Sequence, residues 1–263
     1  MNEVRGLRRP VHLVPLVLLA VFALIVVVTP REAWVQDDAC SSSGGPTVQL
    51  PATKLFIEHN ATDQDTGVHG LFDGVNWTTL CVFDPSGRQI LEVQPKGQLG
   101  DQSISGIFFE SAEPPNAEVP IAEILSRFPE GQYSVRGRAK DGRRLTGAAR
   151  FTHAIPAPPV ITFPHDGEVV PASNLVVRWN HVTATLDGKP LNRTGYQVII
   201  TKDVRDDPNG FSRPTFDVHV LPSVTSLTVP REFLESRTRY ELEVLALESS
   251  GNQTISVLFF QTQ

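Results

Sequence analysis

Residues 240–246 read Tyr-Glu-Leu-Glu-Val-Leu-Ala, so that every second position, from Tyr240 to Ala246, is apolar. A period of two is typical of a β-strand with one buried face. The same alternation recurs in six more short runs between residues 160 and 259. Seven antiparallel strands in about 105 residues predict a two-sheet sandwich. The other apolar positions are Val160, Ile161 and Phe163; Leu175, Val177 and Trp179; Tyr196, Val198 and Ile200; Phe216, Val218 and Val220; Leu227 and Val229; and Ile255, Val257 and Phe259.

The segments on either side of residues 240–246 carry a family resemblance. Residues 233–240 read Phe-Leu-Glu-Ser-Arg-Thr-Arg-Tyr, Ser-Gly-Asn-Gln-Thr follows at 250–254, and Trp179 lies on the second run. Together they resemble the fibronectin type III domain over residues 157–263. The resemblance implies that Trp179 packs in the core from strand B and that the Tyr240 hydroxyl bonds to the backbone just upstream. It also implies a role in display and binding rather than chemistry.

Two features depart from that family. Ser236 stands where the family usually has Pro, and the connection from Lys202 to Pro214 is long and acidic. Neither position belongs to the predicted core, so the expected fold stands. No Arg-Gly-Asp occurs in the chain, so the best-known integrin-binding mode of the family is absent.

Residues 47–156 are also strand-like. Apolar or small residues alternate over 133–139 and again over 145–151, and Asp141-Gly142 between them is a strong hairpin signal. Asp84-Pro85-Ser86-Gly87 predicts another turn, and residues 119–128 predict a short helix that stops before Pro129. We therefore expect a second sandwich, immunoglobulin-like, and an all-β fold class overall.

The N-terminal region predicts export. Arg5, Arg8 and Arg9 precede an uncharged apolar run over residues 13–28, the pattern of a signal peptide or a membrane anchor. The length of the run lies between that of a signal-peptide core and that of a full membrane span and does not separate the two, so residues 11–28 either cross the membrane or are cleaved off. The expected organisation is residues 1–30 as the export segment, 31–46 as a flexible linker, 47–156 as the first sandwich and 157–263 as the second, with a Pro-rich seam at 155–159.

Charge limits the partners. The chain has 23 Lys and Arg against 29 Asp and Glu, a formal net charge of −6, which argues against binding to nucleic acid. The two cysteines, Cys40 and Cys81, provide no metal cluster. Outside the cytoplasm they could pair with each other, Cys40 could pair with another chain, or both could remain free.

One polar segment could bind calcium. Asn60, Asp63 and Asp65 precede Gly67, with Asp73 further on, and carboxylate and carbonyl oxygens are the ligands that Ca²⁺ requires. The spacing is not that of an EF-hand, because Gly74 occupies the closing position. The alternative is a loop in which Asn60 and Asp63 bond to their own backbone.

A basic segment could bind a polyanion. Residues 36–120 contain 3 basic and 12 acidic side chains, whereas residues 121–156 contain 7 and 3. Alternation places part of this charge on one face of the predicted hairpin, where it could contact an anionic envelope polysaccharide or lipid headgroups. The alternative is a solvated face that discourages edge-to-edge pairing. The residues are Arg136, Arg138, Lys140, Arg143 and Arg144.

No motif predicts catalysis. Ser103 and Ser105 lack a nucleophile elbow, and the spacing of Glu110 and Glu113 does not by itself define an acid–base pair. We interpret the histidines as scattered surface or strand-end residues, because no close metal-binding spacing joins them. They are His59, His69, His153, His165, His181 and His219.

The sequence therefore predicts an exported, non-enzymatic binding or adhesion module at the cell envelope, either membrane-anchored or secreted. Its partner would be a protein or an envelope polysaccharide, and no cofactor is expected apart from a possible role for calcium. Two alternatives remain open, a structural spacer in an envelope complex and a calcium-dependent carbohydrate binder.

Overall fold

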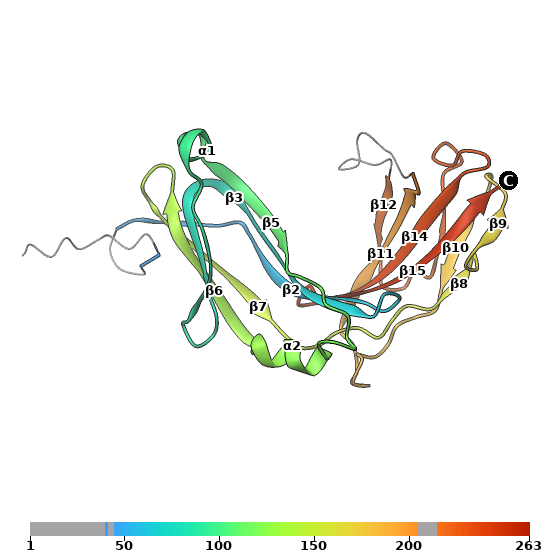
Figure 1. The fold of residues 1–263 in the computed structure, drawn as a ribbon, viewed down its shortest axis with the longest axis horizontal. Coiled ribbons are helices and arrows are strands. Elements are labelled where there is room, and N and C mark those ends of the chain that lie inside the picture. Colours follow the sequence, from blue (N-terminus) through green and yellow to red (C-terminus); the bar gives the residue numbers. More distant parts are fainter. Residues whose placement is uncertain (1–39, 42–44, 205–214) are drawn as a thin grey trace, which may run out of the picture. The chain divides into compact units, whose positions relative to one another are not determined.

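The computed structural model describes residues 40–41, 45–204 and 215–263 (Figure 1). The export segment expected at residues 1–30, including its apolar helix, and most of the expected linker lie outside this part of the chain. No helix in the described ranges is long and apolar enough to cross a bilayer. Almost all the regular structure is β, which confirms the predicted fold class.

The first half of the described chain contains seven strands and two short helices. They are β1 (Thr47–Gln49), β2 (Ala52–Asn60), β3 (Asp65–Phe83), β4 (Gln89–Val93), α1 (Gly97–Gln102), β5 (Ile104–Glu110), α2 (Ile121–Arg127), β6 (Gly131–Ala139) and β7 (Arg144–Phe151).

The long strand β3 belongs to two sheets. Up to Asp73 it pairs with β2 and β5, and from Trp77 it pairs with β6 and then β4. The register with β5 shifts between these two residues, as it does where a bulged strand turns from one sheet into another. All these strands belong to one continuous 12-stranded hydrogen-bonded sheet. The shift in β3 divides this part of it into two layers, which we treat as two sheets: β2, the first half of β3 and β5 form one, and β4, the second half of β3, β6, β7 and β1 form the other. Two packed sheets of this kind confirm the predicted immunoglobulin-like sandwich.

The local predictions in this half are confirmed. Asp141-Gly142 turns the chain between β6 and β7, with Gly142 at a positive φ of 85° that suits glycine. Asp84 begins the β3–β4 turn, where its Oδ1 accepts hydrogen bonds from the backbone N–H groups of Ser86 and Arg88 at 2.9 Å each. The short helix predicted at 119–128 is α2. Helix α1 was not predicted, because it buries no residue and so shows no apolar period.

The second half contains eight strands: β8 (Ile161–Phe163), β9 (Glu168–Val170), β10 (Val176–Trp179), β11 (Arg193–Lys202), β12 (Thr215–Val220), β13 (Ser226–Thr228), β14 (Arg239–Glu248) and β15 (Gln253–Thr262). All seven predicted strands are among them, and β9 is additional. Strands β8, β10 and β13 form one sheet, and β12, β11, β14, β15 and β9 lie side by side in the other (Figure 1).

The two residues singled out by the family resemblance occupy the expected places. Trp179 is 3% exposed and its ring meets that of Tyr196 edge to face at 5.4 Å. The Tyr240 hydroxyl accepts a hydrogen bond from the backbone N–H of Glu235 at 2.8 Å. These contacts confirm the predicted core role of Trp179 and the backbone bond of Tyr240.

The predicted inward face of β15 is wrong. Leu258 and Phe260 point into the second core, whereas Val257 and Phe259 are only half-buried on the opposite face. Residues 257–260 are all apolar, so alternation could not distinguish the two faces. The error matters because Val257 and Phe259 belong to the surface described below.

Two large hydrophobic clusters stabilise the described part of the chain. One draws its buried residues from positions 50–155 and the other from positions 170–260. Strand β15 also pairs in parallel with β2, with Gln253 opposite Glu58 and Ile255 opposite Asn60. Since paired residues of neighbouring strands share a face, the outer face of the β2–β3–β5 sheet continues onto that of the β15–β14–β11–β12 sheet.

Candidate functional site

Three ionisable side chains converge on the outer face of the β2–β3–β5 sheet. His69 Nε2 lies 2.8 Å from Glu113 Oε1, and His69 Nδ1 lies 3.8 Å from Glu58 Oε2. One ligand-type atom of each residue lies within 4.8 Å of the others. The His69 residue is only 3% exposed, so this is a largely enclosed imidazole between two carboxylates.

Strand register brings these residues together. In the β2–β3 hairpin Phe56 lies opposite His69 and Glu58 lies opposite Gly67, and across the other edge of β3 His69 lies opposite Glu110. Gly67 makes room for this arrangement, because a Cβ atom built there would lie 2.4 Å from Glu113 Oε1 and Glu113 would have to move. The missing side chain therefore leaves the space through which Glu113 reaches His69.

Aromatic rings hold the imidazole on both sides. The Phe56 ring meets the His69 ring edge to face at 5.4 Å, and the Phe108 ring does so at 5.8 Å. Phe108 is itself 53% exposed. A large exposed ring packed on a buried histidine is a feature of a contact surface rather than of a core.

The surroundings perturb the carboxylates. Burial raises the pKa of Glu58, although His69 and a hydrogen bond from Gln253 act in the opposite direction. Burial, reinforced by Glu241, Glu58 and Asp217, raises the pKa of Glu243 to about 7. Glu58 thus links the His69 cluster electrostatically to the carboxylates of β12 and β14.

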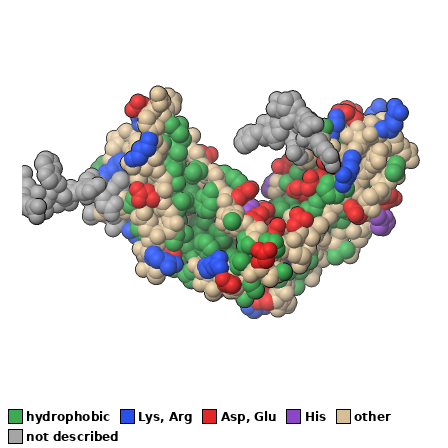
Figure 2. Space-filling model, viewed as in Figure 1, with side chains coloured by type: hydrophobic (Ala, Val, Ile, Leu, Met, Phe, Trp, Pro, Cys, Tyr) green, Lys and Arg blue, Asp and Glu red, His purple; other side chains and the backbone are tan. Residues whose placement is uncertain are grey.

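We call this outer surface the acidic face. Figure 2 shows acidic side chains gathered beside hydrophobic ones on the side of the molecule turned to the viewer. Half-buried Phe56, Val257 and Phe259 and the exposed Phe108 supply its apolar part. Its carboxylates are Glu58, Glu110, Glu113, Asp217, Glu241 and Glu243.

The structure does not bring the four candidate calcium ligands together. Asn60 and Asp65 face each other at one end of the β2–β3 hairpin, whereas Asp73 lies opposite Ala52 at its other end. The Asn60 Oδ1 atom accepts hydrogen bonds from the N–H groups of Thr62 and Asp63, and Asn60 Nδ2 donates to Asp63 Oδ2 at 2.9 Å. This is the self-bonded loop that was the alternative to a calcium site.

The candidate polyanion-binding residues have internal contacts. The Arg136 guanidinium lies 4.6 Å from the centre of the Phe83 ring, and Arg143 forms an ion pair with Asp141 at 2.7 Å. Arg138 donates to the carbonyl of Gly142, and Lys140 donates to that of Asp101. Two guanidinium nitrogens of Arg144, Nε and Nη1, are buried without a hydrogen-bond partner. Most of this charge therefore already serves the fold of the hairpin.

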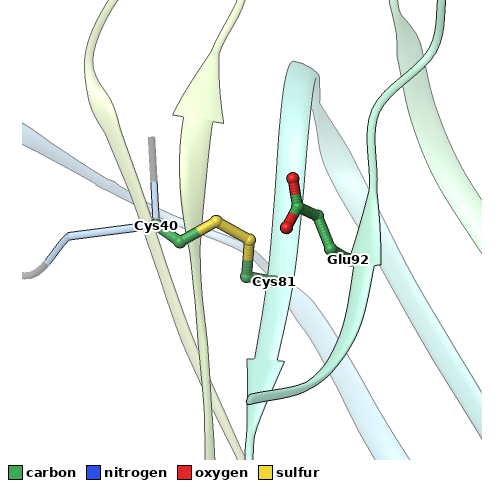
Figure 3. A group of neighbouring side chains, drawn as sticks. All are labelled: Cys40, Cys81 and Glu92. Atoms are coloured by element: carbon green, nitrogen blue, oxygen red, sulfur yellow. A yellow bond between two sulfur atoms is a disulfide. The ribbon is translucent and has the colours of Figure 1, made fainter. Parts of the chain in front are cut away.

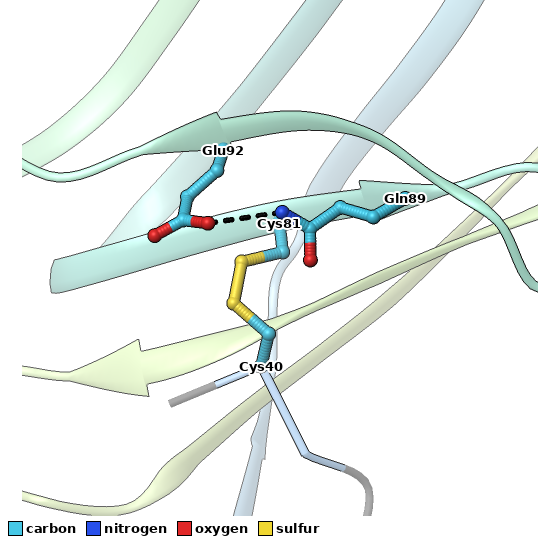
Figure 4. The surroundings of a disulfide bond; sticks show 4 residues. All are labelled: Cys40, Cys81, Gln89 and Glu92. Atoms are coloured by element: carbon cyan, nitrogen blue, oxygen red, sulfur yellow. Dashed lines mark hydrogen bonds between the residues drawn. A yellow bond between two sulfur atoms is a disulfide. The ribbon is translucent and has the colours of Figure 1, made fainter. Parts of the chain in front are cut away.

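Cys40 and Cys81 form a disulfide, with their Cα atoms 5.9 Å apart (Figure 3). Both are buried and pack with Phe83. Glu92 lies beside the sulfur atoms and accepts a hydrogen bond from Gln89 at 2.9 Å (Figure 4). Because the sulfurs are bonded to each other, they offer no thiolate for a metal ion.

The interpretation of the histidines as scattered surface or strand-end residues is wrong for His69, which is buried within β3. His59 is a strand-end residue, one position before the last residue of β2, and is 4% exposed with its Nδ1 atom 3.0 Å from the carbonyl of Asp65. The signal that could have placed His69 beside Glu58 is the hairpin register. Asn60 pairs with Asp65 at the turn of the hairpin. Moving away from the turn two residues at a time along both strands pairs residue 58 with 67 and residue 56 with 69, and places all four on one face.

No protein-family model and no curated protein sequence matches the chain. Among solved structures, the chain is similar to the FN1-FN3 domains of chicken CNTN1, at 18% sequence identity and a TM-score of 0.31, over 84% of this chain and 68% of that one. It is also similar to a tetra-tandem repeat in the extending region of a large adhesion protein, at 11% identity and a TM-score of 0.26, over 81% of this chain and 50% of that one.

Proposed function

We propose that the chain is an exported, non-enzymatic binding module whose acidic face recognises a basic, partly apolar surface of a partner protein. The observation that carries the proposal is the crowding of carboxylates around Glu243. The charged groups that raise its pKa to about 7 are all carboxylates: Glu241, Glu58 and Asp217.

Crowding of carboxylates lowers the stability of the folded state. Like charges held close together on a half-buried surface repel one another, and burial adds a desolvation penalty for each. Perturbed pKa values of this kind concentrate at functional sites. Lys and Arg side chains of a partner would neutralise the carboxylates, and complementary charge gives an interface its specificity and a fast association rate.

The apolar part of the face supports a protein partner over a glycan. Phe108 is 53% exposed, and aromatic side chains surrounded by charges are typical of protein interfaces. The net acidic charge of the chain also disfavours an anionic polysaccharide at this surface.

Export is supported by the N-terminal pattern of Arg5, Arg8 and Arg9 before an apolar run, and by the Cys40–Cys81 disulfide. Disulfides form and persist mainly outside the reducing cytosol. The same two features support the proposal of a location at the cell envelope, anchored or secreted.

The test measures binding of the full-length chain to a synthetic peptide of alternating Lys and Leu. We expect the double variant Glu241→Gln/Glu243→Gln to weaken binding about tenfold, equivalent to about 1.4 kcal/mol. The matched control Glu118→Gln/Glu232→Gln removes the same charge from exposed positions elsewhere in the chain and should bind like the wild type. Equal weakening by both variants would mean that only net charge matters, and would overturn the proposal.

A further inference from the structure

We propose that Glu58, His69 and Glu113 bind one divalent transition-metal ion, with Zn²⁺ as the test case. The inference does not depend on the proposed recognition of a basic partner. It rests on the geometry of the three side chains, on the choice of ligand atoms and on the contacts that hold them.

The spacing of the ligand atoms fits a single ion. Zn²⁺ binds imidazole nitrogen and carboxylate oxygen at about 2.0–2.2 Å, which places neighbouring ligand atoms of a tetrahedron about 3.3 Å apart. Here His69 Nε2 and Glu113 Oε1 are 2.8 Å apart, and one atom from each of the three residues lies within 4.8 Å of the others. Glu113 lies at Nε2, whereas Glu58 Oε2 lies 3.8 Å from the other ring nitrogen, Nδ1. An ion bound to Nε2 therefore requires the Glu58 side chain to rotate toward that nitrogen to complete the set.

The ligand types favour a transition metal over calcium or magnesium. Ca²⁺ and Mg²⁺ take oxygen ligands, whereas an imidazole nitrogen suits Zn²⁺ and its first-row neighbours. One imidazole and two carboxylates also give a neutral complex with a divalent ion. Three protein ligands would leave the fourth position to water or to a group of a partner.

The ligands are held in place before any ion arrives. The edge contacts of Phe56 and Phe108 fix the plane of the His69 ring. Gln253 donates a hydrogen bond to Glu58 Oε2, the oxygen that lies 3.8 Å from His69 Nδ1, and so restrains this carboxylate beside the imidazole. Metal-ligating groups are commonly oriented by outer hydrogen bonds of this kind.

The test uses the full-length chain made without a polyhistidine tag and stripped of metal with EDTA. Calorimetric titration with ZnCl₂ should give one Zn²⁺ per chain. His69→Gln and Glu113→Gln should each weaken binding at least tenfold, taking about tenfold as the smallest effect seen even for outer-shell contacts. His219→Gln, which changes an exposed histidine, should bind like the wild type.

Gly67→Ala gives a sharper variant, because it keeps all three ligands and only places a methyl group where Glu113 lies. It should weaken Zn²⁺ binding while His219→Gln does not. Far-ultraviolet circular dichroism of each variant checks the fold. Should His69→Gln unfold, Glu113→Gln decides the matter, since this side chain is 29% exposed and its replacement retains the shape.

Co²⁺ provides a second readout, since visible absorption of the bound ion reports its coordination. We expect a spectrum with the wild type that His69→Gln abolishes. Absence of Zn²⁺ binding by the wild type, or unchanged affinity in both His69→Gln and Glu113→Gln, would overturn the inference. Binding of the Lys–Leu peptide is measured with ZnCl₂ and with EDTA, so that loss of the metal site and loss of partner recognition are observed separately.

Discussion

Asn252 and Ile57 lie 195 residues apart in the chain and are joined by a buried hydrogen bond, in which the Ile57 N–H donates to Asn252 Oδ1 at 2.8 Å. The Asn252 side chain is fully buried, and its Nδ2 atom donates to the carbonyl of Thr152 at 2.9 Å and to that of Ala154 at 3.3 Å. One carboxamide thereby connects β2, the segment after β7 and the start of β15. Both its donor and its acceptor are used, which is the condition for stable burial of a polar group.

Replacing Asn252 with Ala should therefore destabilise the chain. The substitution leaves the Ile57 N–H and two carbonyls without their partner in a buried place, so we expect a loss of about 2 to 4 kcal/mol in the free energy of unfolding. Urea denaturation monitored by tryptophan fluorescence measures it. Asn192→Ala, at an exposed asparagine in the same Asn-x-Thr context, should change stability by less than about 0.5 kcal/mol. Equal effects of the two substitutions would contradict the structural role of Asn252.

Trp179→Ala tests the second sandwich. The indole is 3% exposed and packs on Tyr196, so its removal should cost about 3 to 5 kcal/mol by leaving a cavity in the core. Thermal unfolding followed by circular dichroism gives the difference. If Trp179→Ala is nearly as stable as the wild type, the Trp179 side chain of β10 does not contribute to the hydrophobic core.

Two tyrosine hydroxyls invite a paired comparison. The Tyr240 hydroxyl accepts the Glu235 N–H, and the Tyr196 hydroxyl accepts the Val182 N–H, each at 2.8 Å. The Tyr240 hydroxyl also donates to the carbonyl of Phe233, at the longer distance of 3.4 Å. Tyr240→Phe keeps the ring and loses both hydrogen bonds, of which only the first is short, so we expect a loss of about 1 kcal/mol, and the same for Tyr196→Phe. Chemical denaturation of both variants measures the losses. If Tyr240→Phe has the same denaturation midpoint as the wild type, the hydrogen bonding of the Tyr240 hydroxyl to the backbone does not stabilise the fold.

The features that could be predicted from the sequence are those that depend on residues close together in the chain. Trp179, Tyr240 and the Asp141-Gly142 turn lie in short patterns whose consequences appear within a few residues, and the structure has them as expected. Tyr196 was predicted only as a core position. Its hydroxyl bond to Val182 spans 14 residues, and no local pattern predicts such a contact.

The candidate site depends on contacts between residues that are even further apart in the sequence. Glu113 reaches His69 from a segment 44 residues away, and Glu58 meets Gln253 from 195 residues away. Asn252 is fully buried, and its local sequence, Ser-Gly-Asn-Gln-Thr, does not indicate this. Strand pairing between distant parts of the chain determines these positions, and alternation within one strand carries no information about it.

The disulfide gives a further prediction. Cys40 and Cys81 are 41 residues apart in sequence, and closing a loop of this length restricts the unfolded chain by up to about 4 kcal/mol. We expect Cys40→Ser to lower the free energy of unfolding by about 2 to 4 kcal/mol under oxidising conditions. Adding a reductant should lower the stability of the wild type and leave that of Cys40→Ser unchanged. If the reductant has no effect on the wild type, the bond does not stabilise the fold.

Glu243 makes stability depend on pH. Its pKa is raised from 4.5 to about 7, first by burial and then by Glu241, Glu58 and Asp217, so between these values the folded state binds more protons than the unfolded state. Stability therefore falls as the pH rises through this window. Glu243→Gln removes the titration, and because solvent screens a half-buried group we expect the variant to gain about 1 to 2 kcal/mol over the wild type at about pH 8 and almost nothing at about pH 4.5.

Urea denaturation of the wild type and of Glu243→Gln at both pH values measures this difference. The control Glu232→Gln changes an exposed carboxylate and should follow the wild type at each pH. A partner that brings Lys or Arg to the acidic face would lower the pKa of Glu243, so its binding should release a proton near pH 7. A Glu243→Gln variant whose advantage is the same at both pH values would show that this carboxylate is not crowded in the folded protein.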